Sequence, residues 1–552
     1  MRVYCLVKFK HIIVLFLALL MWRCAQVAPL TGGQRDSQAP KLLNTIPQNI
    51  SLNFKAKFIE LTFDEYIQVK DIANQLVITP QLKNQPEVEA KGKKVIINLS
   101  YTELLPNTTY RFFFGNSIQD MHEGNTLSNF EYVFSTGNKI DSLVIEGKVN
   151  NAFNLKAESD ITVGLYNSSE SDSVVWKQNP LYFTKTNSNG VFSINYLPPG
   201  DFKAFAFSDK NKNLKFDGGE EMIGFLNNTI NSNVDSNLIF TLFKEKPIKF
   251  FVKKAFSPYY GMAKVIYNAE QDNNVKAFQE SQDKLLCTEG GTNDTCSVYY
   301  HDIFDTLKLV VKHANKSLID TISINLLSNE KFERLKQERK LLLDIELKPL
   351  VNGVMPYYET AALKFNAAMD FTSIDMAKVN LTRKQDTILT KLSPQFKAEG
   401  CDRLLLLEKL SEDAVYDLVI KSGAIKTKFG LPNDSVKISF RTSLPDDYAS
   451  LQLKLLFPDK SDYIIQLMND KQEIARELYC EQSISSSAEQ TFSFKNLLPG
   501  NYYVKLIRDE NKNKMWDTGH LLQKTQPETV YLNAIPIKLL ANWDSESEWK
   551  VK

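Results

Sequence analysis

Residues 209–220 (DKNKNLKFDGGE) occur twice in this 552-residue chain. The second copy, residues 509–520 (DENKNKMWDTGH), lies 300 positions later and aligns without a gap. The match continues upstream, where the turn 197–200 (LPPG) corresponds to 497–500 (LLPG). Similarity at a fixed spacing is the mark of a modular chain. At least one module is therefore used twice.

The sequence around these loops predicts a series of short strands. Residues 58–64 place Ile59, Leu61 and Phe63 on one face and polar residues on the other, a period of two that predicts a half-buried strand. Further strands are predicted at 95–99, 110–114, 132–136, 161–165, 191–194, 202–207, 248–252 and 307–311. Strands of this length joined by turns predict an all-β fold built from sandwiches. The charged stretch 329–340 is predicted to be a short helix or a linker.

Composition limits the function. A chain of this length needs about three to five domains. The 66 basic and 65 acidic residues leave a net charge of +1, so no overall field favours nucleic acid. The five histidines include no pair at an H-x-x-x-H spacing, which argues against a histidine-rich metalloenzyme.

The N-terminus is typical of an export signal. The apolar run 12–22 follows basic residues and is too short to span a bilayer. Residues 1–23 are predicted to be a signal peptide and 24–38 a flexible tether. Cys24 at their boundary resembles the lipidated cysteine of bacterial lipoproteins, although Trp22 and Arg23 stand where small residues are usual. Ordinary cleavage further on and an uncleaved anchor remain alternatives.

Three motifs carry a family resemblance. Residues 63–66 (FDEY), 105–110 (LPNTTY) and 134–136 (FST) resemble the bacterial Ig-like domain of the SbsA type, found in tandem Ig-like lipoproteins of Bacteroidetes. The order strand, L-P-x-G turn, strand, acidic loop resembles prealbumin-like or carboxypeptidase-regulatory sandwiches. The resemblance implies a cell-envelope protein, specifically an outer-membrane lipoprotein facing the periplasm or the surface. Such motifs support a fold better than an activity.

Five domains are predicted. Tyr416 and residues 440–442 repeat Tyr110 and residues 134–136 at a spacing of 306, which indicates a second Ig-like copy. The predicted order is Ig-like domain 39–140, loop-bearing sandwich 141–245, intervening β domain 246–345, Ig-like domain 346–444 and loop-bearing sandwich 445–552.

The acidic loops are candidate calcium sites. Calcium prefers hard oxygen ligands, and positions 1, 3, 5, 9 and 12 of the known loop pattern supply them. The first loop offers Asp209, Asn211, Asn213, Asp217 and Glu220, and the second offers Asp509, Asn511, Asn513 and Asp517, with His520 at position 12. Leu214 stands where the pattern has glycine. The alternative is a polar loop whose Asx side chains bond their own backbone. In either case the role would be structural.

The cysteines leave one question open. Cys287 and Cys296 flank a Gly-Gly loop, and either a small disulfide or two free thiols fits this spacing. No pairing is predicted for Cys401 or Cys480.

Catalysis finds little support in the sequence. No known nucleophile, zinc or phosphate-loop motif occurs. Asp64 and Glu65 are adjacent strand residues that point to opposite faces. The tyrosine pairs 259–260, 357–358 and 502–503 are predicted to pack in cores or across strands instead of lining a glycan groove. We therefore predict a non-catalytic, membrane-tethered scaffold. A receptor for an unknown protein or glycan, and a hydrolase with an unrecognised site, are the alternatives.

Overall fold

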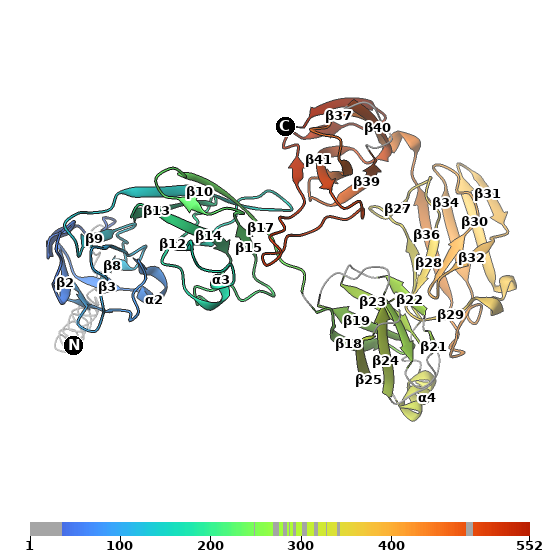
Figure 1. Ribbon diagram of the computed structural model, residues 1–552. Coiled ribbons are helices and arrows are strands. Elements are labelled where there is room, and N and C mark those ends of the chain that lie inside the picture. Colours follow the sequence, from blue (N-terminus) through green and yellow to red (C-terminus); the bar gives the residue numbers. More distant parts are fainter. Residues whose placement is uncertain are drawn as a thin grey trace, which may run out of the picture.

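The computed structural model describes residues 36–551, apart from 248, 269–274, 280–283, 286, 291–293, 301–305, 314–317, 327, 339–342 and 482–488. The described chain is all-β, as predicted, and forms successive two-sheet units (Figure 1). Within these ranges, no helix combines the length and apolarity needed to cross a membrane. The predicted signal peptide and Cys24 lie outside them.

The first Ig-like unit covers residues 42–135. Its larger sheet has the order β1 (Leu42–Ile46), β2 (Phe58–Phe63), β6 (Lys94–Asn98) and β5 (Glu87–Lys91). The facing strands are β4 (Val77–Thr79), β7 (Thr109–Phe113) and β9 (Glu131–Ser135), with the pair β3 (Ile67–Val69) and β8 (Ile118–Asp120) and the short helix α2 (Ile72–Gln75) beside them. Ile59, Leu61 and Phe63 are fully buried, which confirms the alternation predicted for this strand.

The two loop units share one topology. In the first loop unit (143–242), one sheet contains β13 (Val191–Leu197), β10 (Leu143–Asn151) and β17 (Asn237–Leu242), and the other contains β12 (Tyr182–Lys185), β11 (Thr162–Asn167), β14 (Asp201–Phe207), β15 (Ile223–Phe225) and β16 (Ile230–Asn231). In the second loop unit (449–550), the counterparts are β40 (Glu489–Leu497), β37 (Ala449–Leu456) and β44 (Asp544–Lys550), facing β39 (Ile474–Cys480), β38 (Asp462–Asn469), β41 (Gly500–Asp509), β42 (Val530–Leu532) and β43 (Ile537–Leu539). In both units the last strand pairs in parallel with the first.

The second Ig-like unit covers residues 345–442. One sheet contains β26 (Ile345–Lys348), β28 (Ala362–Phe365), β33 (Arg403–Leu406) and β32 (Phe396–Glu399). The other contains β27 (Val354–Met355), β36 (Val436–Thr442), β34 (Val415–Ile420), β30 (Val379–Gln385) and β31 (Ile388–Leu392), with the pair β29 (Met369–Asp370) and β35 (Lys426–Thr427) alongside.

Matching hydrogen bonds relate the two Ig-like units. The hydroxyl of Tyr110 accepts the backbone N–H of Leu105 at 2.7 Å, and that of Tyr416 accepts the backbone N–H of Ser411 at 2.7 Å. Thr136 and Thr442 donate their hydroxyls to the carbonyl oxygens of the same two residues, at 2.6 and 2.7 Å. A tyrosine that bonds back to the preceding corner is a known device of Ig-like sandwiches.

The middle unit covers residues 252–337. Its sheets are β18 (Val252–Tyr259), β19 (Met262–Tyr267), β23 (Thr295–Tyr299) and β22 (Cys287–Gly290), and β21 (Lys284–Leu285), β20 (Val275–Gln279), β24 (Thr306–His313) and β25 (Leu318–Asn325). The charged stretch that follows is a helix, α4 (Asn329–Gln337). The strand predicted at 248–252 is wrong, because β18 begins only at Val252.

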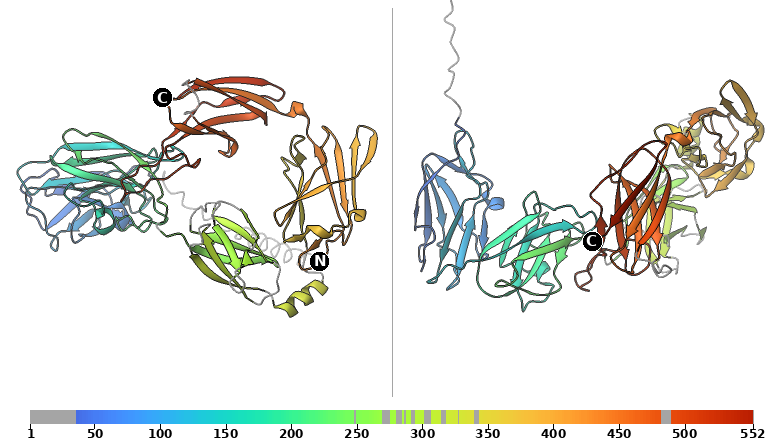
Figure 2. Two further views of the ribbon diagram at one scale, coloured as in Figure 1. Left: turned by 45° about the vertical axis from the view of Figure 1, so that its right-hand side comes forward. Right: turned by 90° about the horizontal axis from the view of Figure 1, so that it is seen from above.

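Contacts between units bring distant parts of the chain together. Tyr299 donates its hydroxyl to Asp402 of the second Ig-like unit, and Tyr358 packs against Tyr448 with ring centres 5.2 Å apart. The C-terminal unit, red in Figures 1 and 2, then lies against the first loop unit, although about 200 residues separate the two in sequence. Residues 143–550 therefore form a closed arrangement of four units.

Candidate functional site

The first acidic loop follows β14 and is closed by its own side chains. The two carboxylate oxygens of Asp209 accept the backbone N–H groups of Asn213 and Leu214, both at 2.9 Å. Asn211 and Asn213 donate their side-chain amides to Asp217 at 2.6 and 2.8 Å. Backbone donors thus surround the first aspartate and side-chain donors surround the second.

The second loop, after β41, repeats these bonds. Asp509 accepts the backbone N–H groups of Asn513 at 3.1 Å and Lys514 at 2.8 Å. Asn511 donates to Asp517 at 2.6 Å and Asn513 donates to it at 2.5 Å. Leu214 and Lys514, at the position where the calcium pattern has glycine, adopt φ values of 59° and 65°. The left-handed turn therefore forms without glycine, at a cost in strain.

A third carboxylate completes each loop, and the sequence did not reveal it. Glu221 accepts the backbone N–H groups of Lys210 at 3.0 Å and Asp217 at 2.8 Å. Glu220, the predicted ligand, is exposed and forms an ion pair with Lys244 at 2.9 Å. The only signal in the sequence was that Glu220 and Glu221 are adjacent, so that one of the two carboxylates would face the loop.

In the second loop the same role falls to Glu528. Its carboxylate accepts the backbone N–H groups of Glu510 at 2.8 Å and Asp517 at 2.9 Å. Burial raises the pKa of Glu528, and the nearby charges of Asp509 and Asp517 raise it further. His520, which the alignment placed at this position, lies elsewhere.

In both loops the aspartates proposed as calcium ligands already accept hydrogen bonds from the loop itself. The described part of the chain contains no group of three or more His, Cys, Asp or Glu side chains arranged to hold a metal. An ion in the first loop would have to draw on Asp209, Asp217 and the amide oxygens of Asn211 and Asn213. Calcium remains a prediction, and the described hydrogen bonds are those of a loop held by its own backbone.

The two loops differ after their second aspartate. Three residues (218–220) separate Asp217 from Glu221, whereas ten (518–527) separate Asp517 from Glu528. The longer segment, here called the finger (518–527), folds back through a bridge between His520 and Thr525. Its tip leaves the second loop unit.

The finger docks on the first loop unit. Leu521 is 1% exposed and belongs to a buried cluster with Val175 and Phe225 of that unit. Its backbone N–H donates to Glu245 at 2.6 Å, and Thr518 donates its hydroxyl to the carbonyl oxygen of Lys244 at 2.7 Å. An apolar side chain inserted into another unit's core, framed by hydrogen bonds, makes this a specific junction.

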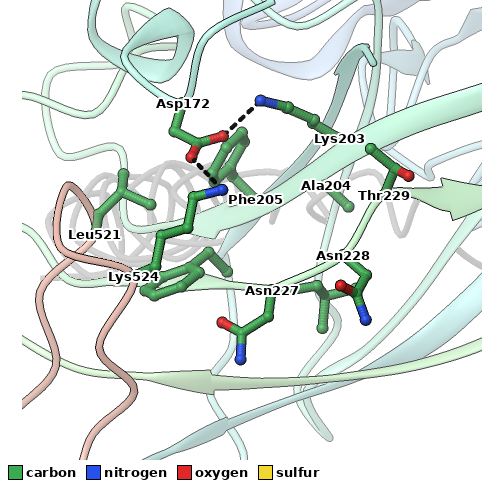
Figure 3. A pocket seen from close by; sticks show the side chains of 11 residues that line it. Asp172, Lys203, Ala204, Phe205, Asn227, Asn228, Thr229, Leu521 and Lys524 are labelled. Carbon is green, nitrogen blue, oxygen red and sulfur yellow. Dashed lines mark hydrogen bonds and ion pairs between the residues drawn. The ribbon is translucent and has the colours of Figure 1, made fainter. Parts of the chain in front are cut away.

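Asp172 lies beside the buried leucine, between two lysines (Figure 3). Lys203 of the same unit approaches it to 2.6 Å and Lys524 of the finger approaches it to 3.2 Å. Burial raises the pKa of Asp172, but these two cations outweigh it and the net shift is downward. The adjoining cavity of about 80 Å³ is well below the roughly 300–1,000 Å³ of ligand pockets, so this place serves packing.

An aromatic contact extends the junction. Phe153 of the first loop unit packs against Trp516 with ring centres 4.9 Å apart. The ammonium group of Lys505 lies 3.6 Å from the centre of the Phe153 ring. Lys505 is only 5% exposed, and burial lowers its pKa to about 8. A cation over an aromatic face recovers part of the cost of that burial.

The structure answers the question that the sequence left open about the cysteines. Cys296 is a free and buried thiol, so the small bridge considered between Cys287 and Cys296 does not form, while Cys401 is disulfide-bonded. In register, Cys287 lies opposite Tyr299, three positions from Cys296.

The tyrosine pairs lie at junctions and in a core. Tyr260 packs against Phe429 across the junction of the middle and second Ig-like units. Tyr357 and Tyr358 contact Tyr448 near the next junction, and Tyr502 is in a core. The side chain of Tyr259 lies outside the described residues.

Comparison with known proteins supports the fold. Residues 36–136 match the family model of the bacterial Ig-like domain, which confirms the Ig-like prediction for the first unit. A search of curated proteins finds no match. Similar solved structures include the Bacillus anthracis TIE protein (9% identity, covering 95% of this chain and 76% of that one, TM-score 0.14), the S-layer protein SbsC (11%, 89% and 66%, 0.13) and BcpA, the major pilin subunit of Bacillus cereus (10%, 75% and 99%, 0.13). TM-scores this low carry no argument about fold or function, so the support comes from the family match alone.

Proposed function

We propose that this protein is a non-catalytic scaffold of the bacterial cell envelope, held to a membrane by a lipid on Cys24. The observation that supports it best is the docked finger, which ties the last unit of the chain to the second. Units joined only by linkers move independently by default. A buried leucine, ion pairs and an aromatic contact at the junction restrict that motion.

A scaffold needs a fixed shape more than a reactive site. Asp172 pairs with lysines of both units, and Glu221 and Glu528 accept backbone N–H groups, so these carboxylates hold the backbone and the neighbouring units. The residues around the Ig-like corners do the same. This use of polar groups favours a structural role over the hydrolase alternative.

Metabolic labelling with an alkyne fatty acid tests the tether. The wild-type protein is expected to take up label and to sediment with membranes, whereas Cys24→Ser is expected to lose the label and become soluble. A Cys24→Ser protein that stays membrane-bound would indicate an uncleaved anchor. Wild-type protein without label would overturn lipidation.

A further inference from the structure

The last strand of the chain has an open edge. β44 (Asp544–Lys550) ends the sheet β40-β37-β44 and pairs on one side only, with β37. Directly after it lies the C-terminus, marked C in Figure 1. An open strand edge offers a row of unpaired backbone N–H and C=O groups to any further strand.

The hydrogen bonds at the two ends of β44 show which residues face that edge. Ser450 donates its N–H to the carbonyl of Trp543, and Val551 donates its N–H to the carbonyl of Leu456. The odd-numbered residues therefore bond to β37. Since alternate residues of a parallel strand direct their backbone groups to opposite sides, Asp544, Glu546 and Glu548 direct theirs outward.

A groove runs along this edge. It has a volume of about 530 Å³, and its lining includes five consecutive strand residues, 544–548. A space that touches both alternating sets of residues must lie beside the strand and not on one face of the sheet. Its other wall includes Ile535, Leu540 and Trp543, which are 75%, 44% and 63% exposed. Three large apolar side chains thus stand open beside unpaired backbone.

The charge of the groove is negative. Asp544, Glu546 and Glu548 line it against a single lysine, Lys538. Lys454 lies 3.7 Å from Glu548 but is closer, at 3.0 Å, to Glu489, so it neutralises little of the row. Such a row repels an acidic segment and attracts a basic one.

The other loop unit shows that the fold does not need this acidity. β17 is the equivalent edge strand, and its outward positions are Asn237, Ile239 and Thr241. Ile239 is 65% exposed there, without any charged guard. Charged residues often protect open edges from aggregation, but the same edge in the first copy has no charged residue at its outward positions.

We infer that the open edge of β44 and its groove bind an extended basic segment of a partner protein, which adds to the sheet as a further strand. Its backbone pairs with Asp544, Glu546 and Glu548, its lysines or arginines face their carboxylates, and an apolar side chain covers Trp543. This is the strand-addition mode of peptide recognition. The inference does not depend on the lipid tether.

Fluorescence polarisation with detergent-solubilised full-length protein tests it. The probe is a labelled eight-residue peptide of alternating lysine and valine, which is expected to bind. The glutamate–valine peptide is expected not to bind. Glu546→Lys should weaken binding about tenfold or more, and Trp543→Ala about fivefold. Glu103→Lys, an exposed site on the first Ig-like unit, makes the same change in net charge and should leave binding unaltered.

A lysine–valine peptide N-methylated at alternate residues separates strand addition from simple charge attraction. Loss of its binding supports the inference, because methylation blocks backbone pairing while it leaves the side chains and the net charge of the peptide unchanged. Equal binding of the methylated peptide, equal binding to Glu546→Lys, or no binding of the parent peptide would each overturn it; the last outcome would mean that the acids only protect the edge.

Discussion

The two loop units have the same strands and the same loop hydrogen bonds, but they use them differently. In the first unit, the apolar anchor of the loop, Phe216, is fully buried in its own core. In the second unit the equivalent residue, Trp516, packs against Phe153 of the other unit. After its second aspartate the second loop is seven residues longer than the first, and this ten-residue segment is the finger. The first loop unit thus provides the docking surface, and the second loop unit provides the segment that docks on it.

The difference between the units shows where a repeated fold can change. Strand pairing and loop closure are internal to each copy, so both copies keep them. The segment between the second aspartate and the third carboxylate lies outside both, and loops tolerate insertions well. Docking arose at this tolerant position.

The largest expected effect comes from Leu521→Asp. The substitution places an unpaired charge in the apolar cluster of the first loop unit. This should destabilise the docked state by about 3 kcal/mol or more, which is more than the surrounding surface contacts contribute to docking. The finger should then release. Small-angle scattering is expected to show a larger radius of gyration.

Leu522→Asp is the matched control, because Leu522 is the next residue and is 59% exposed. It should leave the scattering curve unaltered. If Leu521→Asp gives the same curve as wild type, the finger does not hold the units together.

Calcium offers the next comparison. A ligand bound only to the folded state stabilises it by about 2.7 kcal/mol at a concentration 100 times its Kd. If the loops bind calcium, the melting temperature should rise relative to chelator, and Asp209→Ala and Asp509→Ala should each remove part of the rise. The melt of each variant, with calcium and with chelator, assigns the effect to one loop or both. An unaltered wild-type melt would leave the loops held by their own hydrogen bonds alone.

Sequence patterns predicted what is local and periodic. Alternation placed Ile59, Leu61 and Phe63 in a core, and the repeat spacing paired Tyr110 with Tyr416, whose hydrogen bonds prove equivalent. Position 12 of the calcium-loop pattern predicted Glu220 as the third carboxylate, whereas the structure places Glu221 there. Glu528 was missed because the finger separates it from its loop, and docking of Leu521 depends on a partner surface about 300 residues away. Such contacts leave no periodic signal.

Lys505 tests the aromatic part of the junction, with a smaller effect. Its pKa of about 8 in the folded protein is below the usual 10.5, so protonation opposes folding fully below pH 8. The penalty disappears as pH rises towards about 10.5, so stability should increase across that window. Lys505→Met should remove this pH dependence and, after allowing for the lost contact with Phe153, stabilise the protein by about 1–2 kcal/mol at pH 7.

Urea unfolding at pH 7.5 and 9.5 measures both effects of the lysine. Wild type should gain stability at the higher pH relative to Lys505→Met. Equal pH responses of the two proteins would show that the ammonium group is not buried when the junction forms.

The smallest expected effect concerns the strained turns. Lys514 and Leu214 hold left-handed conformations that glycine adopts without strain, so Lys514→Gly and Leu214→Gly should each stabilise their unit by about 0.5–1 kcal/mol. Lys471→Gly, in a turn of the second loop unit at a residue without a positive φ, should destabilise slightly because glycine gains more freedom on unfolding. Chemical denaturation of the three variants measures the differences. If both loop variants lose stability as Lys471→Gly does, then the side chains at the turn contribute more than the backbone strain costs, and the resemblance of the two loops to the glycine-containing calcium pattern is one of spacing alone.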